Sequence, residues 1–281
     1  IVTLLVGLSL YRMEHSSELV KASSMEMLTE SAQARIESQG EVQAAGIRQQ
    51  FMDAYQYGHG FSRQVLFLRE QAEKRFLDAF DLREDMTRQV KSALQANPEL
   101  LGLSLVFEAN ALDGKDELFA GQAELGSNDK GRFALYWSQP TPGKVTSMAL
   151  PESDMADTST GPSGQAANAW FTCPRTTLKP CVIEPYFYVI DGQKVLMTSI
   201  VFPLMVNGKV IASLSVDINL NSLQAVSQGA SKKLYDGQTS VSIISPVGLL
   251  AGYSPDASKL SQRLDQVDRN SGAQLIGALA G

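Results

Sequence analysis

Histidine and cysteine are scarce in this sequence, which contains two residues of each among 281. His15 and His59 stand far from both cysteines along the chain, so a metal site built from these residue types lacks ligands. No HExxH or GxSxG motif occurs, and neither cysteine has a histidine nearby to activate it. The sequence therefore predicts a protein without enzyme activity, metal or cofactor.

A surplus of basic side chains is also missing, because 24 Lys and Arg stand against 30 Asp and Glu, with a net charge of -6. Binding to a phosphate backbone requires clustered Lys and Arg, so a nucleic-acid partner is excluded. An acidic surface suits small cationic molecules, and solubility is the alternative explanation.

Long hydrophobic runs are absent. The first segment, IVTLLVGLSLY, is apolar, but a membrane-spanning helix takes roughly 20 such residues. We interpret residues 1–10 as the end of a transmembrane helix, with a buried helix turn as the alternative. No basic segment precedes it, as a signal peptide would require.

The two cysteines, Cys173 and Cys181, are close in sequence and bracketed by Pro174 and Pro180. A disulfide can close so short a loop, and such a pair in an otherwise cysteine-free chain is typical of an oxidising compartment. Reduced thiols in a cytosolic loop are the alternative. With an apolar segment in front, the pair favours the periplasm.

Residues 11–98 have the pattern of a long stalk helix and a connecting helix, with one apolar stripe among polar side chains. Gly58 and Gly60 are expected to loosen the helix, and Asn97 and Pro98 to end it. The stripe is also apolar enough for a homodimer contact, although packing on the protein's own sheet would explain it as well. It begins with Leu19, Met27, Leu28, Ile36, Ile47, Phe51 and Ala54.

A strand-like period begins at Leu101, with LGLSLVFEA and later FALYWSQ, and residues 141–168 are expected to form a long loop over a sheet. Three strands are predicted over residues 182–190, 195–203 and 210–216. DGQ and NGK turns join them as hairpins, so they are expected to form an antiparallel sheet. A helix is expected after Asp217, then a strand–turn–strand segment and a short helix over residues 256–264. These few strands cannot close a core of their own, so we expect this last part to be incomplete.

Six phrases in order, GRFALYW, ESDMADTSTGPSG, NAWFTCP, EPYFYV, VLMTSIVFPL and DINLNSLQ, resemble the double Cache sensor domain of bacterial methyl-accepting chemotaxis proteins. The resemblance covers essentially all of residues 11–281. It is greater to the polyamine- and histamine-sensing receptors of pseudomonads than to the amino-acid sensors.

The resemblance implies an α/β (α+β) fold, in which a long N-terminal helix precedes two PAS-like modules with antiparallel sheets, the second incomplete. Residues 99–225 would form the membrane-distal module that binds the ligand, and residues 226–281 part of the membrane-proximal module. It also implies an inner-membrane receptor with this region in the periplasm, membrane helices on both sides, and cytoplasmic chemotaxis signalling proteins as partners.

The ligand-binding residues of the amino-acid sensors are only partly present. Their carboxylate-gripping Arg corresponds to Asn168, which cannot supply a guanidinium clamp. Their ammonium-holding Asp at the end of the last strand is kept as Asp217, whereas the other, two residues after Tyr186, is replaced by Tyr188. This pattern predicts that the ligand is a cation without a carboxylate.

Asp217 would neutralise the cation, because burying an unpaired charge is prohibitive. Ring faces would surround it, with core packing as the alternative, and a ring wall without a second carboxylate favours a quaternary ammonium such as choline. Acidic side chains of the covering loop could serve the far ammonium of a polyamine, or lie in solvent. The predicted ligand-binding residues are Tyr136, Trp137, Glu152, Asp154, Asp157, Trp170, Phe171, Tyr186, Tyr188 and Asp217; Cys173 and Cys181 would form a structural disulfide.

Three alternatives remain. The same fold could sense a polyamine or histamine. It could be the sensor of a histidine kinase or a cyclase rather than of a chemoreceptor. It could also be an adhesion or assembly module without a small ligand.

Overall fold

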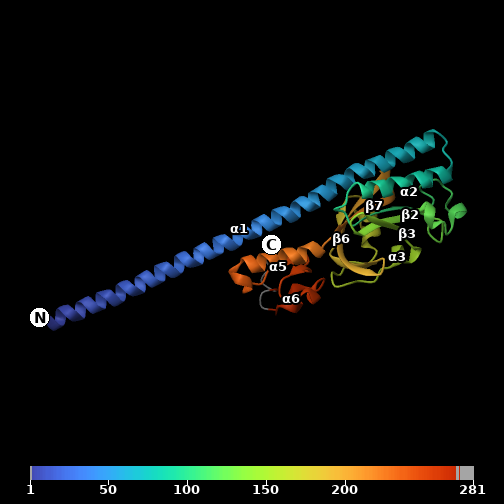
Figure 1. Cartoon of the computed structure of the whole chain (residues 1–281). Coiled ribbons are helices and arrows are strands. Elements are labelled where there is room, and N and C mark those ends of the chain that lie inside the picture. Colours follow the sequence, from blue (N-terminus) through green and yellow to red (C-terminus); the bar gives the residue numbers. More distant parts are fainter. Residues whose placement is uncertain (1, 270–271, 273–281) are drawn as a thin grey trace. The chain divides into compact units, whose positions relative to one another are not determined.

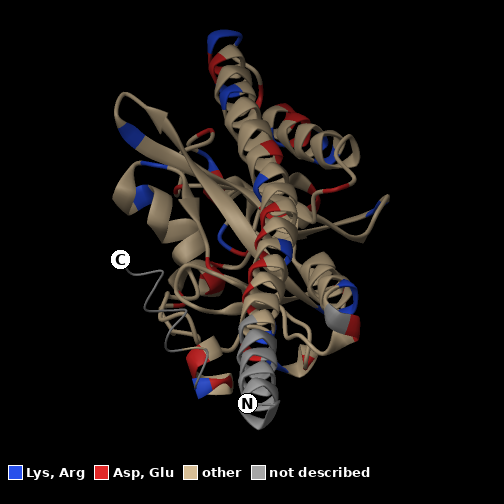
Figure 2. Ribbon diagram, turned by 90° about the vertical axis from the view of Figure 1, so that its left-hand side faces the viewer, with Lys and Arg blue, Asp and Glu red and all other residues tan. Residues whose placement is uncertain are grey.

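The computed structural model describes residues 2–269 and residue 272, and it divides the chain into two units, Ile1–Gln49 and Gln50–Gly281. The first unit is the N-terminal part of helix α1 (Val2–Lys74), along which basic and acidic residues are interspersed (Figure 2). Within the part of the chain described, no helix has a stretch both long and apolar enough to cross a bilayer. The assignment of residues 1–10 to a membrane helix stays a prediction, and residue 1 lies outside the described residues.

The second unit is built on one antiparallel sheet with the strand order β3-β2-β1-β7-β6-β4, in which β5 also pairs with β6. The predicted mixed α/β class with a long N-terminal helix and an antiparallel sheet is therefore confirmed. The strands are β1 (Gly102–Phe107), β2 (Ala134–Thr141), β3 (Lys144–Ala149), β4 (Cys181–Val182), β5 (Tyr186–Ile190), β6 (Gln193–Val206) and β7 (Lys209–Asn219).

Both predicted hairpin turns are present, and their backbone explains their sequence. Asp191 and Gly192 join β5 to β6 with φ of 49° and 75°, and Asn207 and Gly208 join β6 to β7 with φ of 51° and 77°. Two-residue hairpins of this kind require positive φ at both positions, which Asn-Gly and Asp-Gly tolerate best. A β-bulge between Leu204 and Met205 then shifts the β6–β7 register by one residue, which places Asp217 opposite Ser199.

Two helices cover one face of the sheet, where α2 (Ala79–Gln95) lies beside the end of α1 (Figure 1). The Tyr57 hydroxyl donates a hydrogen bond of 3.1 Å to the Ala93 carbonyl and joins the two helices. Gly58 does not loosen α1 as predicted, and the helix continues unbroken through it and Gly60 to Lys74. A Cβ on Gly58 would stand 2.3 Å from the Phe202 ring, so this glycine allows helix and sheet to approach closely.

The other predicted boundaries are partly wrong. Residues 141–168 are not all loop, because β3 pairs with β2 at the sheet edge and α3 (Glu152–Ala156) follows. The half-exposed pattern of an edge strand hides its period. The predicted strand over 182–190 is split in two around Pro185, which cannot donate a ladder hydrogen bond.

The C-terminal segment forms a small hairpin beside a helix. It contains α5 (Asn221–Lys233), the turn η3 (Tyr235–Gly237), and the paired strands β8 (Ser242–Ile244) and β9 (Leu250–Tyr253). One helix over 256–264 was predicted, but η4 (Ala257–Lys259) and α6 (Leu264–Val267) are separated by Ser261, whose φ of 63° interrupts a helix. The division into modules at residues 225 and 226 stays a prediction.

Arg83 of α2 is the largest fully buried charged side chain in the described part of the chain. It binds Asp113 at 2.7 and 2.9 Å and Asp116 at 2.8 Å, and donates to the Ser127 hydroxyl and the Gly131 carbonyl. These bonds hold the long connection between β1 and β2, with its turns η1 (Asp116–Phe119) and η2 (Ala123–Leu125), against α2.

Replacing Arg83 with Ala should lower the free energy of unfolding by about 3–5 kcal/mol, because two buried carboxylates lose their counter-charge. Urea denaturation followed by circular dichroism measures the change. Arg88→Ala, which removes an exposed ion pair with Asp85 on the same helix, serves as control and should change stability by less than about 1 kcal/mol. Equal effects of the two substitutions would contradict the assignment.

Candidate ligand-binding site

A cavity of about 610 Å³ lies on the side of the sheet away from α1 and α2. Successive side chains of a β-strand point to opposite faces of the sheet. On β7, Val216 faces Gly58 of α1, and the next residue, Asp217, lines the cavity on the opposite face. Strand residues form the floor, and the segment from Asp157 to Ala167 forms much of the wall. Leu260, Ser261 and Gln262 from the C-terminal segment complete the lining.

Seven of the ten predicted ligand-binding residues line this one cavity. They are Tyr136, Asp154, Asp157, Trp170, Tyr186, Tyr188 and Asp217. They come from five separate parts of the sequence, which the fold brings together.

Asp217 is 4% exposed and is held by the strands on either side. Its Oδ1 atom accepts hydrogen bonds from the Ser199 hydroxyl at 2.8 Å and the Ser215 hydroxyl at 2.6 Å. Since the Ser199 proton points to Asp217, the Tyr186 hydroxyl donates to the Ser199 oxygen at 3.0 Å. Both recorded bonds reach Oδ1, and the Tyr136 hydroxyl also lowers the pKa of this carboxylate.

Burial raises the pKa of Asp217 from its ordinary value of 3.8 to about 6, against the lowering effect of its hydrogen bonds to serine. The carboxylate is therefore charged at neutral pH, at a cost. Within the described ranges, no Lys, Arg or His lines the cavity to compensate it. The cavity therefore contains a buried negative charge that a positively charged ligand would neutralise.

Aromatic rings enclose the carboxylate. The rings of Tyr136 and Tyr188 meet edge to face with centroids 6.2 Å apart, and Trp170 and Tyr186 also line the cavity. Burial, followed by the charge of Asp217, raises the pKa of Tyr136 well above its ordinary value, and burial raises that of Tyr188 to about 12. Both phenols thus stay neutral.

Tyr136 is 3% exposed, and its hydroxyl interacts with the Asp217 carboxylate, although no hydrogen bond of ordinary geometry reaches it from the described residues. Its ring lies against Gly102 of β1, where an added Cβ would stand 2.7 Å from the hydroxyl oxygen. A buried polar atom without a partner is uncommon in folded proteins. The hydroxyl can accept a hydrogen bond from a group that enters the cavity.

Four carboxylates line the cavity: Asp154, Asp157, Glu184 and Asp217. Sequence reasoning missed Glu184. The signal was present, because Glu184 precedes Tyr186 by two positions, and residues two apart on an extended segment face the same side. Burial raises the pKa of Asp154, whereas hydrogen bonds from Ser159 lower that of the exposed Asp157.

Three predicted residues lie elsewhere. Trp137 follows Tyr136 on β2 and so faces the helices, where the Lys91 ammonium lies 5.1 Å from its ring centroid. Glu152 binds Arg132 through both carboxylate oxygens, at 2.7 and 3.1 Å. Phe171 is buried beneath Arg175, whose guanidinium carbon lies 4.7 Å from the ring centroid. The structure does not bring these three side chains into the cavity.

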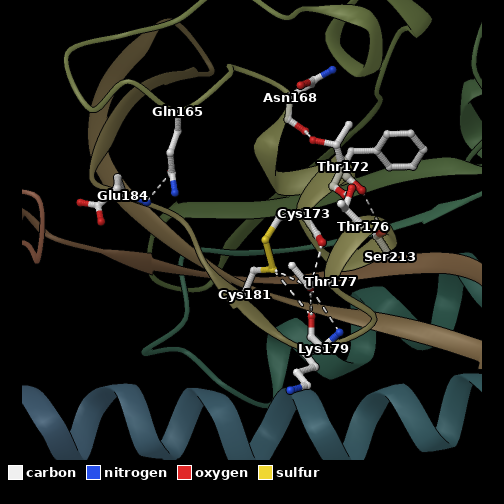
Figure 3. The surroundings of a disulfide bond; sticks show 11 residues. Gln165, Asn168, Thr172, Cys173, Thr176, Thr177, Lys179, Cys181, Glu184 and Ser213 are labelled. Atoms are coloured by element: carbon white, nitrogen blue, oxygen red, sulfur yellow. Dashed lines mark hydrogen bonds between the residues drawn. A yellow bond between two sulfur atoms is a disulfide. The ribbon is translucent and has the colours of Figure 1, made fainter.

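The cysteines fix the helix that carries Trp170. Cys173 of α4 (Ala169–Thr177) is disulfide-bonded to Cys181 of β4, with Cα atoms 6.3 Å apart (Figure 3). Asn168, at the start of α4, donates from Nδ2 to the Met155 carbonyl at 2.8 Å and does not line the cavity. The position of the carboxylate-binding Arg in the amino-acid sensors therefore has a structural role here.

Metal binding finds no support in the described part of the chain, where no group of three or more His, Cys, Asp and Glu could hold an ion. The chemistry of the cavity is that of carboxylates, phenols and rings.

Comparison with known proteins gives a consistent set of similarities. Residues 86–225 match the family described as methyl-accepting chemotaxis protein-like, first PDC sensor domain. The chain is 59% identical to the methyl-accepting chemotaxis protein TlpQ of Pseudomonas aeruginosa over 280 aligned residues. The alignment covers all of this chain and 39% of TlpQ. The chain thus spans about two fifths of the length of that curated relative.

Solved structures show the same fold at low sequence identity. The periplasmic sensory domain of the Campylobacter jejuni chemoreceptor Tlp1 is 13% identical with a TM-score of 0.56, over 84% of this chain and 77% of that chain. A structure titled methyl-accepting chemotaxis protein X is 21% identical with a TM-score of 0.53, over 85% of this chain and 84% of that chain.

Asp217→Asn should stabilise the ligand-free protein, because the amide keeps the shape and an oxygen acceptor but removes a buried charge. A pKa of about 6 in the folded protein means that the carboxyl favours folding at low pH and that this contribution is lost as the pH rises through 6. The variant should gain about 3 kcal/mol at pH 7.5 and about 1 kcal/mol at pH 4.5. Denaturant titrations at both pH values measure this, and a gain independent of pH would contradict it.

Proposed function

Because this chain belongs to the PDC (Cache) sensor domains of methyl-accepting chemotaxis proteins, we propose that its cavity binds a small organic cation, with Asp217 as the counter-charge. The family predicted from the sequence is confirmed. The nature of the ligand rests on one observation above all: a buried, ionised carboxylate in a cavity lined by four acidic side chains and, among the described residues, by no basic one.

Coulomb attraction and ring geometry act together in this proposal. An ammonium beside Asp217 would restore the charge balance that burial disturbs, which makes the interaction strong in a medium of low dielectric constant. The faces of Tyr136, Tyr188 and Trp170 can add cation–π contacts, each worth roughly 0.5–2 kcal/mol when desolvated. A cavity of about 610 Å³ is of the size that binds small molecules.

Two classes of cation fit these walls. The ring faces suit a quaternary ammonium such as choline. The replacement of an aspartate by Tyr188 favours this class, because it removes a second carboxylate. The Tyr136 hydroxyl oxygen and the three carboxylates beyond Asp217 can accept hydrogen bonds, which favours an amine that donates them, such as a polyamine or histamine. Affinity measurements separate these classes.

The setting of the site follows from the family. We propose that the chain is the periplasmic part of an inner-membrane receptor, that it acts as a homodimer, and that ligand binding is passed to cytoplasmic chemotaxis proteins. A histidine kinase or cyclase as the output is the alternative. Catalysis by this region itself is not expected.

A panel of choline, putrescine and histamine, with glutamate as the anionic control, tests the ligand class by isothermal titration calorimetry. At least one cation should bind and glutamate should not. Asp217→Ala should weaken the binding roughly 30-fold or more, because truncating one partner of a buried charge pair costs about 2 kcal/mol or more. Tight putrescine binding without choline binding would overturn the quaternary preference, and glutamate binding would overturn the proposal.

Affinity for the cation should also fall as the pH falls through 6, since only the carboxylate form of Asp217 binds it. With a pKa of about 6 in the free protein, affinity at pH 5 should be about tenfold lower than at pH 8. Choline, if it binds, suits the measurement because a quaternary ammonium does not titrate. An affinity that is the same at both pH values would show that Asp217 is not the counter-charge.

A further inference from the structure

The turn between α1 and α2 presents apolar side chains to solvent. Phe76 is 94% exposed, and Leu77 and Phe80 next to it are 40% and 49% exposed. We propose that this turn is a contact surface for a second copy of the chain, in which Phe76 of each copy enters a hollow on the other. The contact is separate from the cavity and does not depend on its ligand.

The backbone of Phe76 has a conformation that favours glycine. Its φ is 53°. The Phe76 N–H donates to the Glu73 carbonyl at 3.2 Å, and the next N–H, of Leu77, donates to the Ala72 carbonyl at 2.9 Å. Helices that end with these two bonds usually have glycine at the left-handed position, because a bulky side chain there costs free energy. Folding alone would thus favour glycine, and packing does not explain the ring.

Both ends of the turn are held in place. The two bonds at the end of α1 close that helix, and at the start of α2 the Phe80 N–H donates to the Asp78 Oδ1 atom at 2.8 Å. Figure 1 shows the turn at the edge of the second unit, where the chain reverses from α1 into α2. A ring on so constrained a segment loses little conformational freedom when a partner covers it.

A hollow of about 190 Å³ lies beside this turn, between α1 and α2. Arg75 and Leu77, the two neighbours of Phe76 in the sequence, line it, but Phe76 does not. An apolar cavity of about 150 Å³ can hold a benzene ring, so the hollow has room for one phenyl ring. Its apolar walls are Leu68, Ala72, Leu77, Leu82 and Met86.

Charges of both signs also line the hollow. Arg75 follows the end of α1, and Asp85 lies on α2. The ion pair of Asp85 with Arg88 is exposed and contributes little, so Asp85 can bind another cation. When Phe76 enters the hollow of a second copy, Arg75 next to it comes close to Asp85 of that copy. The surface is therefore complementary to itself in charge as well as in shape.

A second copy accounts for the ring and the hollow together. A two-fold contact uses the same surface on both partners, so a ring and a hollow on one surface fill each other twice. A different protein that filled the hollow would leave the strained and exposed Phe76 without a role. The contact is small and weak by itself, and it gains strength where other contacts already hold two copies together.

Replacing Phe76 with p-benzoylphenylalanine in the full chain tests the contact directly. The substituted residue keeps the ring and forms a covalent bond to a neighbouring group on irradiation. Unlabelled and nitrogen-isotope-labelled protein are mixed at high concentration, so that mass spectrometry distinguishes bonds between copies from bonds within one chain. Bonds from Phe76 to residues 68–86 of the other copy are expected.

Three results of the irradiation would overturn the proposal. They are bonds within one chain only, bonds to another surface of the second copy, and no bonds between copies at all. Bonds to a different protein in a cell extract, with none between copies of this chain, would show that the surface serves another partner.

The variants Phe76→Gly and Leu178→Gly separate association from folding. Leu178 is the matched control, because it also ends a helix with a positive φ, of 56°, and is 49% exposed. It lines neither the hollow nor the cavity. Both variants should raise the Tm of the dilute protein by about 2 °C, since glycine relieves the same backbone strain.

Only Phe76→Gly should weaken self-association. The association constant measured by sedimentation velocity should fall roughly 100-fold, because each contact buries two rings, and Leu178→Gly should leave it unchanged. An equal constant for Phe76→Gly and the wild type would contradict the proposal. So would a lower Tm of Phe76→Gly, since it would show that the ring packs within its own chain.

Discussion

The buried carboxylate of Asp217 is the constraint on which the site depends. It is kept in the sheet by two serine hydroxyls bound to one oxygen, and Tyr186 is bound to one of those serines in turn. Hydrogen bonds of this kind reduce the cost of burying the charge but do not remove it, since the pKa remains raised. The uncompensated charge therefore lowers the stability of the ligand-free protein, and a bound cation would compensate it. The free energy lost in stability without ligand is thus recovered in binding.

The alternation of β-strands separates packing from recognition. On β2, β6 and β7 one face supplies Trp137, Phe202 and Val216 to the helices, while the other supplies Tyr136, Met197 and Asp217 to the cavity. A shift of register by one residue would move every cavity group to the helix face. The Asn207–Gly208 turn and the β-bulge between Leu204 and Met205 together set the register of β6 and β7, so both are part of the site.

The sequence predicted the sheet, its hairpins and most of the cavity, because strand periodicity and Asp-Gly and Asn-Gly turns are local signals. It failed where the determining contact is distant in sequence. Gly58 looked like a helix breaker but is a packing residue against Phe202, and Glu152 looked like a ligand-binding residue but is bound to Arg132. Trp137 and Phe171 were chosen as aromatic neighbours of site residues without regard to the side on which each lies. Glu184 was missed although it stands two positions before Tyr186 on an extended segment and lines the same cavity.

Two contacts connect the cavity to the rest of the second unit. Val216, next to Asp217 on β7, lies against Gly58 of α1. A displacement of Asp217 would therefore move the strand that packs against α1. On the other side the Ser261 hydroxyl donates to the Pro185 carbonyl at 3.4 Å, directly beside Glu184. A ligand shifts a conformational equilibrium only by binding one state more tightly than the other. A cation at Asp217 would therefore act on α1 by binding more tightly to one of two positions of β7 against Gly58.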